Sequence, residues 1–145
     1  LRPQLLDRFG LCVNIQGAVV LEERVEVMER RVAFDEDPGA FAARWQENSE
    51  QLARSMDHAM ALYPEVTIQR SLLLDIARYC VDVGVDGHRG DIIMMKTAKT
   101  LAAVHGRKEV TAADVEEAAR FVLPHRLRRQ PLQDVVENIK PLRGS

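Results

Sequence analysis

The sequence predicts a mainly α-helical protein with one short β-strand near its N-terminus. Apolar residues recur at helical spacing through most of the 145 residues. Proline and glycine divide these stretches into pieces of helix length. Apolar and polar residues alternate convincingly in only one place, residues 11–16. Together these three observations favour a helical bundle.

The composition is that of one globular domain, with 29% charged and 46% hydrophobic residues. The net charge of −2 excludes a general electrostatic attraction to nucleic acid or to a membrane surface. Cys12 and Cys80 lie in apolar segments, which predicts buried thiols in a reducing, cytoplasmic compartment. The chain begins at Leu1, inside a predicted helix, so we expect it to be part of a longer protein.

The first predicted elements are a helix over residues 1–10 and the strand over residues 11–16. Pro3 suits the first turn of the helix and Gly10 its end, which places Asp7 and Arg8 on the last turn. A lone strand cannot satisfy its own backbone groups. We therefore expect its sheet to lie outside this chain.

Two amphipathic helices are expected next, over residues 22–34 and 38–63. The first has one apolar face, and between the two helices Asp37 is a suitable cap and Pro38 a suitable first residue. A single apolar stripe runs along the second helix, formed by Phe41, Trp45, Leu52, Met56, Ala59 and Tyr63.

Three further helices are predicted after a short extended connector at residues 66–68. A helix over residues 71–83, capped by Ser71, is apolar on most sides and is expected to be the central buried one. The next spans residues 90–104 and ends at Gly106, and a capping box of Thr111 and Asp114 begins the last, which ends at Pro124. Residues 131–145 are expected to form a short helix and a loose tail. The inward positions of the helix over residues 90–104 are Ile92, Met95, Ala98, Leu101 and Ala102, and those of the last are Val115, Ala118, Ala119 and Val122.

The turn over residues 84–91 is the first candidate site, because it combines glycines, acids, a histidine and an arginine between two helices. Arg89 stands at a helix N-terminus, where it can meet an anion; the alternative is a surface arginine. Asp86, His88 and Asp91 have metal-ligand chemistry, but a hydrogen-bonded polar turn is favoured, so no metal site is predicted.

Arg8 is the second candidate, as a charge donor to a ligand on another subunit, and the alternative is a solvated arginine near a helix end. The basic run at residues 125–129 is interpreted either as a nucleic-acid contact or, preferably, as a solvated helix end. Met56, Met60, Met94 and Met95 form either an adaptable binding surface or, preferably, core.

Three segments resemble the AAA+ ATPase subunit of magnesium chelatase and its chelatase-like relatives: LRPQLLDRFG at 1–10, DGHRGDI at 86–92 and LPHRLRRQPL at 123–132. The similarity covers nearly the whole chain. It implies an AAA+ C-terminal helical lid bundle, in which the short strand is left over from the core sheet. It also implies three parts: a core remnant at 1–21, the lid at 22–130 and a C-terminal extension at 131–145.

The same resemblance implies a ring-forming ATPase that uses ATP and Mg²⁺, with the nucleotide between neighbouring subunits. Arg8 matches the arginine finger, Asp7 an acid of the same interface, and Arg89 the sensor-2 arginine. An arginine supplied by a neighbouring subunit contributes about 10³–10⁵ to the rate of phosphoryl transfer. This chain has no Walker motifs, so by itself it is not expected to hydrolyse ATP.

The implied reaction is insertion of Mg²⁺ into a tetrapyrrole, together with a von Willebrand-type subunit and a large porphyrin-binding subunit. His88 departs from the Leu usual in magnesium chelatase motors and is closer to cobaltochelatase-like proteins, which leaves Co²⁺ as an option for the metal. No nucleic-acid or membrane partner is expected. The alternatives are a non-enzymatic helical interaction module and a catalytically dead AAA+ platform subunit.

Overall fold

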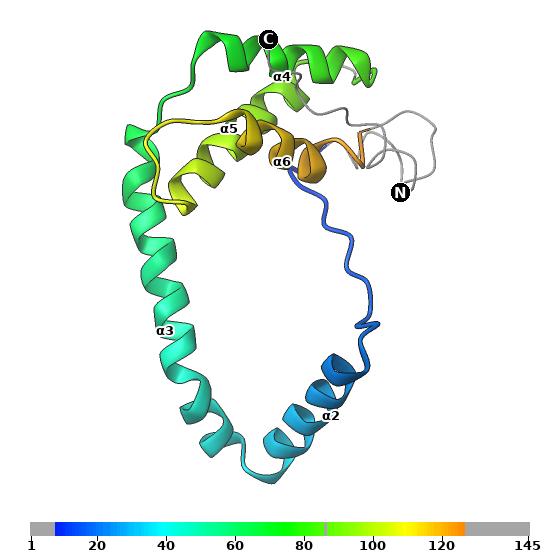
Figure 1. Ribbon diagram of the computed structural model, residues 1–145, viewed down its shortest axis with the longest axis vertical. Helices are drawn as coiled ribbons and strands as arrows, with labels where there is room; N and C mark the ends of the chain where they lie inside the picture. Colours follow the sequence, from blue (N-terminus) through cyan, green and yellow to red (C-terminus); the bar gives the residue numbers. More distant parts are fainter. Residues whose placement is uncertain (1–7, 86, 127–145) are drawn as a thin grey trace. The chain divides into compact units, whose positions relative to one another are not determined.

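A computed structural model describes residues 8–85 and 87–126 of the chain (Figure 1). Within these residues the chain divides into two compact units, one built from residues 14–57 and the other from residues 8–13 and 58–126. The described helices are α2 (Leu21–Glu36), α3 (Pro38–Leu62), η1 (Tyr63–Glu65), α4 (Arg70–Asp82), α5 (Arg89–Val104) and α6 (Ala112–Val122). The prediction of a mainly helical fold is confirmed.

The β-strand predicted over residues 11–16 is not formed. No other strand lies beside this segment in the described part of the chain, so its backbone has no ladder to join. It runs instead as an irregular segment, and the Cys12 N–H donates to the carbonyl oxygen of Phe121 at 2.7 Å. The β-type pairing in the described residues is an isolated parallel bridge between Thr67, in the connector that the sequence predicted as extended, and Glu109, in the connection between α5 and α6.

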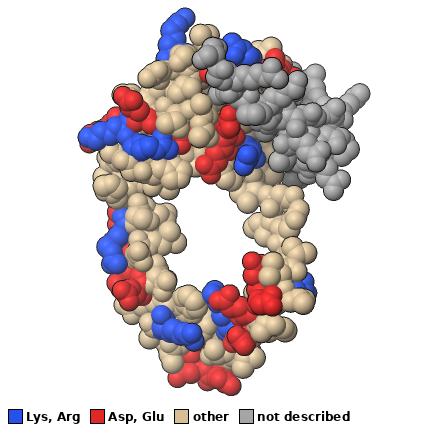
Figure 2. Space-filling view, in the orientation of Figure 1, with Lys and Arg blue, Asp and Glu red and all other residues tan. Residues whose placement is uncertain are grey.

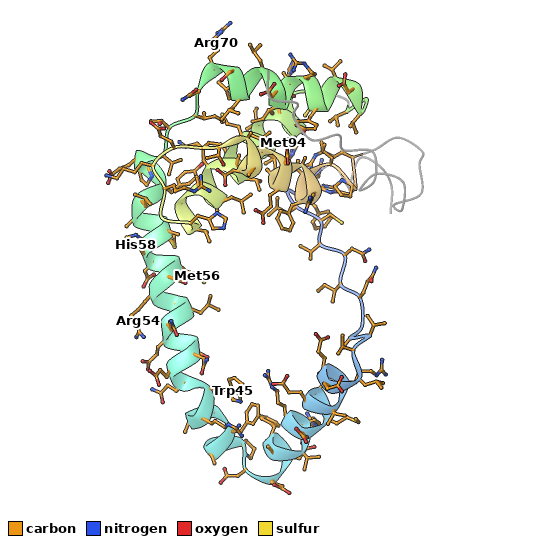
Figure 3. The ribbon with its side chains drawn as sticks, in the orientation of Figure 1. Trp45, Arg54, Met56, His58, Arg70 and Met94 are labelled. Atoms are coloured by element: carbon orange, nitrogen blue, oxygen red, sulfur yellow. The ribbon has the colours of Figure 1, made fainter. Side chains whose placement is uncertain are left out.

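The unit of residues 14–57 contains α2 and the first part of α3, joined at Asp37. The Asp37 carboxylate accepts the Ala40 N–H at 2.9 Å, so the predicted cap of α3 is confirmed. An aromatic cluster lies where the two helices meet: the rings of Phe34 and Phe41 pack edge to face at 5.7 Å, and Trp45 lies 6.2 Å from Phe41 (Figure 3).

Outside this aromatic cluster the unit buries little apolar surface. No residue of α2 is buried, and the stripe predicted along α3 leaves Leu52 and Met56 exposed. Ala59, which belongs to the other unit, is the buried residue of α3. Among the described residues the stripe is partly covered at both ends, at Phe41 and Trp45 and again at Ala59 and Tyr63, and it is exposed between them.

The core of the second unit, which we call the lid core, is formed by α4, α5 and α6. The helix α5 lies at its centre and packs against both of the others. Met94 of α5 is fully buried there (Figure 3), and Ala98 and Ala102 let the neighbouring backbones approach closely. The sequence predicted α4 as the central helix; this was wrong, because α4 exposes Leu74 and Val81 while α5 carries the small residues.

Two local predictions for these helices are also corrected. Ile92 was predicted to face inward, but it is 49% exposed, and Met94 takes the buried position. Ser71 was predicted to cap α4, but the cap residue is Gln69, without a side-chain hydrogen bond. Gly106 ends α5 as predicted, with φ of 69° in the left-handed region.

The capping box of α6 is confirmed and is extended by an ion pair. The buried Asp114 accepts the N–H and hydroxyl of Thr111 at 2.8 and 2.9 Å, and Arg107 contacts both carboxylate oxygens at 2.6 and 2.7 Å. Burial favours the neutral acid, but these hydrogen bonds prevail and lower the pKa of Asp114 to about 2. The carboxylate therefore ties the α5–α6 connection to the start of α6.

Basic and acidic residues both lie on the face of the molecule that Figure 2 shows. Figure 2 shows basic and acidic side chains side by side on the visible face, in keeping with the net charge of −2. None of the helices in residues 8–85 and 87–126 is long and apolar enough to cross a membrane.

Candidate functional site

The candidate site lies where residues 8–13, which we call the arm, contact the lid core. Three consecutive carbonyl oxygens of the arm accept hydrogen bonds from lid arginines. Arg89 Nη2 donates to Arg8 O at 3.2 Å. Arg126 donates from Nη2 to Phe9 O at 2.8 Å and from Nη1 to Gly10 O at 3.1 Å. The lid thus holds the arm by its main chain.

Arg89 is the first residue of α5, and the turn before it sets its position. Gly84 and Gly87 have φ of 71° and 74°, a conformation that glycine adopts without strain. Gly90 follows Arg89 and is required for a different reason: a Cβ there would lie 2.8 Å from Val85 Cγ1. The absence of a side chain at Gly90 lets the turn pack directly against the start of α5.

Arg126 is buried, with 8% of its surface exposed. Besides the two arm carbonyls, its Nη1 donates at 2.6 Å to the carbonyl of Val122, the last residue of α6. A buried guanidinium needs several acceptors to offset the loss of water, and these three carbonyls supply them. The Arg126 Cδ lies 3.7 Å from the Cβ position of Gly90, an ordinary van der Waals distance, so the stem of Arg126 passes close to the start of α5.

His125 adds a second contact to the same carbonyl. Its Nε2 lies 2.8 Å from Phe9 O and 2.7 Å from Arg126 Nη1. With its proton on Nε2 the ring donates to Phe9; with the proton on Nδ1 it accepts from Arg126. A single tautomer serves only one of these contacts, and His125 itself lies partly exposed at the edge of the arm.

The structure brings together two of the three residues predicted for the site. Arg8 and Arg89 are both exposed, and the hydrogen bond from Arg89 to the Arg8 carbonyl places them at one surface. Two guanidinium groups at one surface suit a multiply charged anion such as a triphosphate. The third residue, Asp7, lies outside the described residues, as does Asp86 of the metal-cluster alternative. Within residues 8–85 and 87–126, no group of three His, Cys, Asp or Glu side chains gathers to hold a metal ion.

Sequence reasoning missed the role of Arg126. Both interpretations of the basic run made its arginines surface residues, whereas Arg126 is buried and bonded to main-chain carbonyls. Its position four residues after Val122, at a helix end that Pro124 terminates, was the available signal, since basic side chains bond to terminal carbonyls. Residues 127–129 of the run lie outside the described part of the chain.

The cysteines and the methionines differ in how deeply the structure buries them. Cys80 is buried, its Sγ lies 3.8 Å from the Met94 Sδ, and burial together with the nearby Asp91 carboxylate raises the pKa of its thiol to about 12. Cys12 is only partly buried, in contrast to its prediction.

Of the four methionines considered as a set, Met94 lies in the core, Met95 is partly buried, and Met56 and Met60 are exposed. Neither interpretation of the methionines holds for all four.

The chain is similar in sequence to known proteins. The AAA lid domain family matches residues 74–143. A magnesium-chelatase subunit ChlI homolog of Methanocaldococcus jannaschii is 43% identical over 133 residues, covering 92% of this chain and 36% of that protein. The magnesium-chelatase 38 kDa subunit of Chlorobaculum tepidum is 43% identical over 135 residues, covering 93% and 34%. An uncharacterized protein of Mycobacterium tuberculosis is 42% identical over 134 residues, covering 92% of this chain and 21% of that protein.

The chain therefore spans about a third of the length of the two magnesium-chelatase relatives and a smaller share of the mycobacterial protein. The AAA lid domain match at residues 74–143 includes α5, α6, Arg89 and Arg126.

Proposed function

The chain belongs to the AAA+ family of magnesium-chelatase and chelatase-like ATPase subunits, and from this premise we propose that it forms the lid of a ring-shaped ATPase motor. The identity of about 40% to magnesium-chelatase subunits supports a place in a chelatase. We further propose the division into a core remnant at 1–21, a lid at 22–130 and an extension at 131–145.

In this proposal Arg8 is the arginine finger and Arg89 the sensor-2 arginine, with Asp7 beside the finger at the same interface. The observation that carries it is the hydrogen bond from Arg89 Nη2 to Arg8 O at 3.2 Å. Since the Arg89 guanidinium is bonded to the main chain of Arg8, the Arg89 guanidinium and the Arg8 backbone lie next to each other on the subunit surface. We infer that both serve the same nucleotide, the one bound by the neighbouring subunit.

The physical contribution of the two arginines is charge stabilisation. Phosphoryl transfer spreads negative charge over the terminal phosphate oxygens, and a guanidinium positioned in advance stabilises that charge without reorganisation. The proposed cofactors are ATP and Mg²⁺, for which the remainder of the subunit provides the phosphate loop. Arg8 and Arg89 supply one edge of the site.

The work of the motor is proposed to be insertion of a divalent metal into a tetrapyrrole. Mg²⁺ is the metal that the names of the relatives indicate, and Co²⁺ is kept as the alternative because of His88. The proposed partners are further copies of the subunit, a von Willebrand-type subunit and a large porphyrin-binding subunit.

The test is Arg89→Ala in the complete subunit that contains this chain. We expect ATP turnover to fall by well over about tenfold while circular dichroism shows an intact helical fold. Arg70→Ala is the matched control, because Arg70 is an exposed arginine at the first residue of α4, as Arg89 is of α5 (Figure 3). Turnover of Arg89→Ala close to that of the Arg70 control contradicts the sensor role.

A further inference from the structure

We propose that Arg126 is a positioning residue for Arg8 and that it acts by holding the arm against α6. The inference rests on the proposed role of Arg8 at the neighbouring nucleotide. Arg126 itself is buried, so we do not propose that it touches the nucleotide. It acts instead on Phe9 and Gly10, the two residues that directly follow Arg8.

The contacts fix the direction of the arm as well as its place. One planar guanidinium donates to two successive carbonyls, Phe9 O at 2.8 Å and Gly10 O at 3.1 Å. A rigid fork that satisfies two acceptors leaves the peptide between them little freedom to rotate. Two residues further on, the Cys12 N–H is bonded to Phe121 O at 2.7 Å, so the arm is fixed at both ends of this short stretch.

The same guanidinium joins the arm to the end of α6. Its Nη1 donates at 2.6 Å to Val122 O, and Val122 is fully buried in the lid core. A displacement of α6 therefore moves the Phe9 and Gly10 carbonyls, and Arg8 with them. The orientation of the lid thereby sets where the finger points, although Arg8 and Arg126 are far apart in the sequence.

Arginine is suited to this role in a way that lysine is not. An ammonium group is a compact, strongly hydrated charge, and it cannot reproduce the flat two-nitrogen contact with Phe9 and Gly10. A helix end alone does not need such a group, because water or a local turn can satisfy the last carbonyls. The burial of Arg126 is explained by the arm that covers it.

The first test measures the arm directly, without nucleotide. In the complete subunit, the rate at which iodoacetamide alkylates Cys12 is followed peptide by peptide by mass spectrometry, with Cys80 as an internal reference. Arg126→Met keeps the aliphatic stem and removes the fork, so we expect Cys12 to react roughly tenfold faster while Cys80 stays protected. Arg120→Met, at an exposed arginine of α6, is the matched control and leaves both rates unchanged.

The second test measures the effect on Arg8. We expect Arg126→Met to lower kcat for ATP by at least about tenfold with KM within about twofold, since a finger acts mainly in the transition state. We expect Arg126→Lys to restore little of this. Mixing Arg126→Met with a subunit whose phosphate loop is inactivated should recover activity, because each mutant then supplies the part that the other lacks.

Two results would overturn the inference. One is an unchanged Cys12 rate in Arg126→Met, which would show that the arm stays in place without the guanidinium. The other is faster reaction of Cys80 as well as Cys12 in both Arg126 variants, without recovery on mixing, which would show that Arg126 only holds the lid core together. A failure of the proposed function looks different: Arg8→Ala then hydrolyses ATP normally, whatever Cys12 does.

Discussion

The Arg89 guanidinium donates a hydrogen bond from Nη2 to the main-chain oxygen of Arg8 at 3.2 Å, across 81 residues of sequence. The acceptor belongs to the main chain, and Arg8 is exposed. The lid therefore places Arg8 while leaving its guanidinium available to a ligand. This arrangement leads to a prediction about which subunit's nucleotide each arginine serves.

Mixing experiments distinguish the two possible sites of action of Arg89. If Arg8 and Arg89 of one subunit both act on the neighbour's nucleotide, every interface in a mixture of Arg8→Ala and Arg89→Ala subunits lacks one arginine, so ATP turnover stays low. If Arg89 acts on its own subunit's nucleotide, random mixing restores roughly a quarter of the interfaces. We expect no recovery, and a turnover rate near a quarter of wild type would contradict the shared site.

The control for this experiment is a mixture in which recovery is expected. Arg8→Ala subunits are mixed with subunits inactivated in their phosphate loop, and about a quarter of the interfaces then combine an intact loop with an intact finger. Recovery here shows that the subunits exchange, which makes the absence of recovery in the first mixture meaningful.

Asp114 is expected to make the stability of the lid core depend on pH in the acid range. Its pKa in the folded protein is about 2, below the ordinary value of 3.8. A lowered carboxyl pKa stabilises the fold above about pH 4, by about 2 kcal/mol, and this stabilisation is lost as the pH falls toward 2. We expect Asp114→Asn to lower the free energy of unfolding at pH 7 by at least this amount and to flatten its dependence on pH between 4 and 2.

Urea unfolding followed by circular dichroism across this pH range measures the effect. Asp35→Asn is the matched control, since Asp35 is an exposed carboxylate paired with Arg31 on α2 and such pairs contribute little. Parallel pH curves for wild type and Asp114→Asn would contradict the assignment of the acid sensitivity to this carboxylate.

Gly90 is expected to tolerate no side chain while Val85 is in place. The Cβ of Gly90→Ala would lie 2.8 Å from Val85 Cγ1, so the turn before α5 must shift, at a cost of about 1–3 kcal/mol. The second substitution Val85→Ala removes the clashing methyl, and we expect it to recover part of this loss. Thermal unfolding of the single and double variants tests both expectations.

Gly17→Ala is the control for the glycine effect, because no atom lies within 4 Å of the Cβ position at Gly17. Its melting temperature should match or slightly exceed that of the wild type. If Val85→Ala worsens the loss instead of relieving it, the close approach to Val85 is not the reason for the glycine.

Trp45, the one tryptophan of the chain, reports on the unit of residues 14–57. Its ring lies 6.2 Å from Phe41 and 4.3 Å from the Arg30 guanidinium. We expect Phe41→Ala to open this cluster, to shift the Trp45 fluorescence to longer wavelength and to leave the thermal unfolding of the lid core unchanged. Leu52→Ala, at an exposed position of α3, should leave the emission unchanged.

Local signals in the sequence predicted most helix boundaries. The Asp37 cap, the Gly106 stop and the box of Thr111 and Asp114 each depend on residues a few positions apart, and all three are present in the structure. Such features can be predicted because both partners lie in one stretch of sequence. The strand at residues 11–16 could not be predicted in the same way, because a β-strand forms only when a second strand is present to pair with its backbone.

Burial and the candidate site depend on partners distant in sequence, and here prediction failed in part. The apolar residues on most sides of α4 predicted that this helix is central, yet the small buried alanines of α5 make α5 the central helix. Arg8 and Arg89 were each expected from resemblance, but nothing in the sequence indicated that one holds the other's carbonyl. The burial of Arg126 likewise depends on an arm more than a hundred residues away in sequence.

The lack of buried residues in α2 has a consequence for how the chain behaves over time. A helix of 16 residues with no buried residue gains little from packing beyond the contact at Phe34, and isolated helices of this length are marginal in water. Its amides are thus expected to exchange with deuterated solvent orders of magnitude faster than those of α5, where Met94, Ala98 and Ala102 are sealed from water. Amide exchange in this chain is therefore expected on two separate timescales, and the slower exchange belongs to α5, the helix that begins with Arg89.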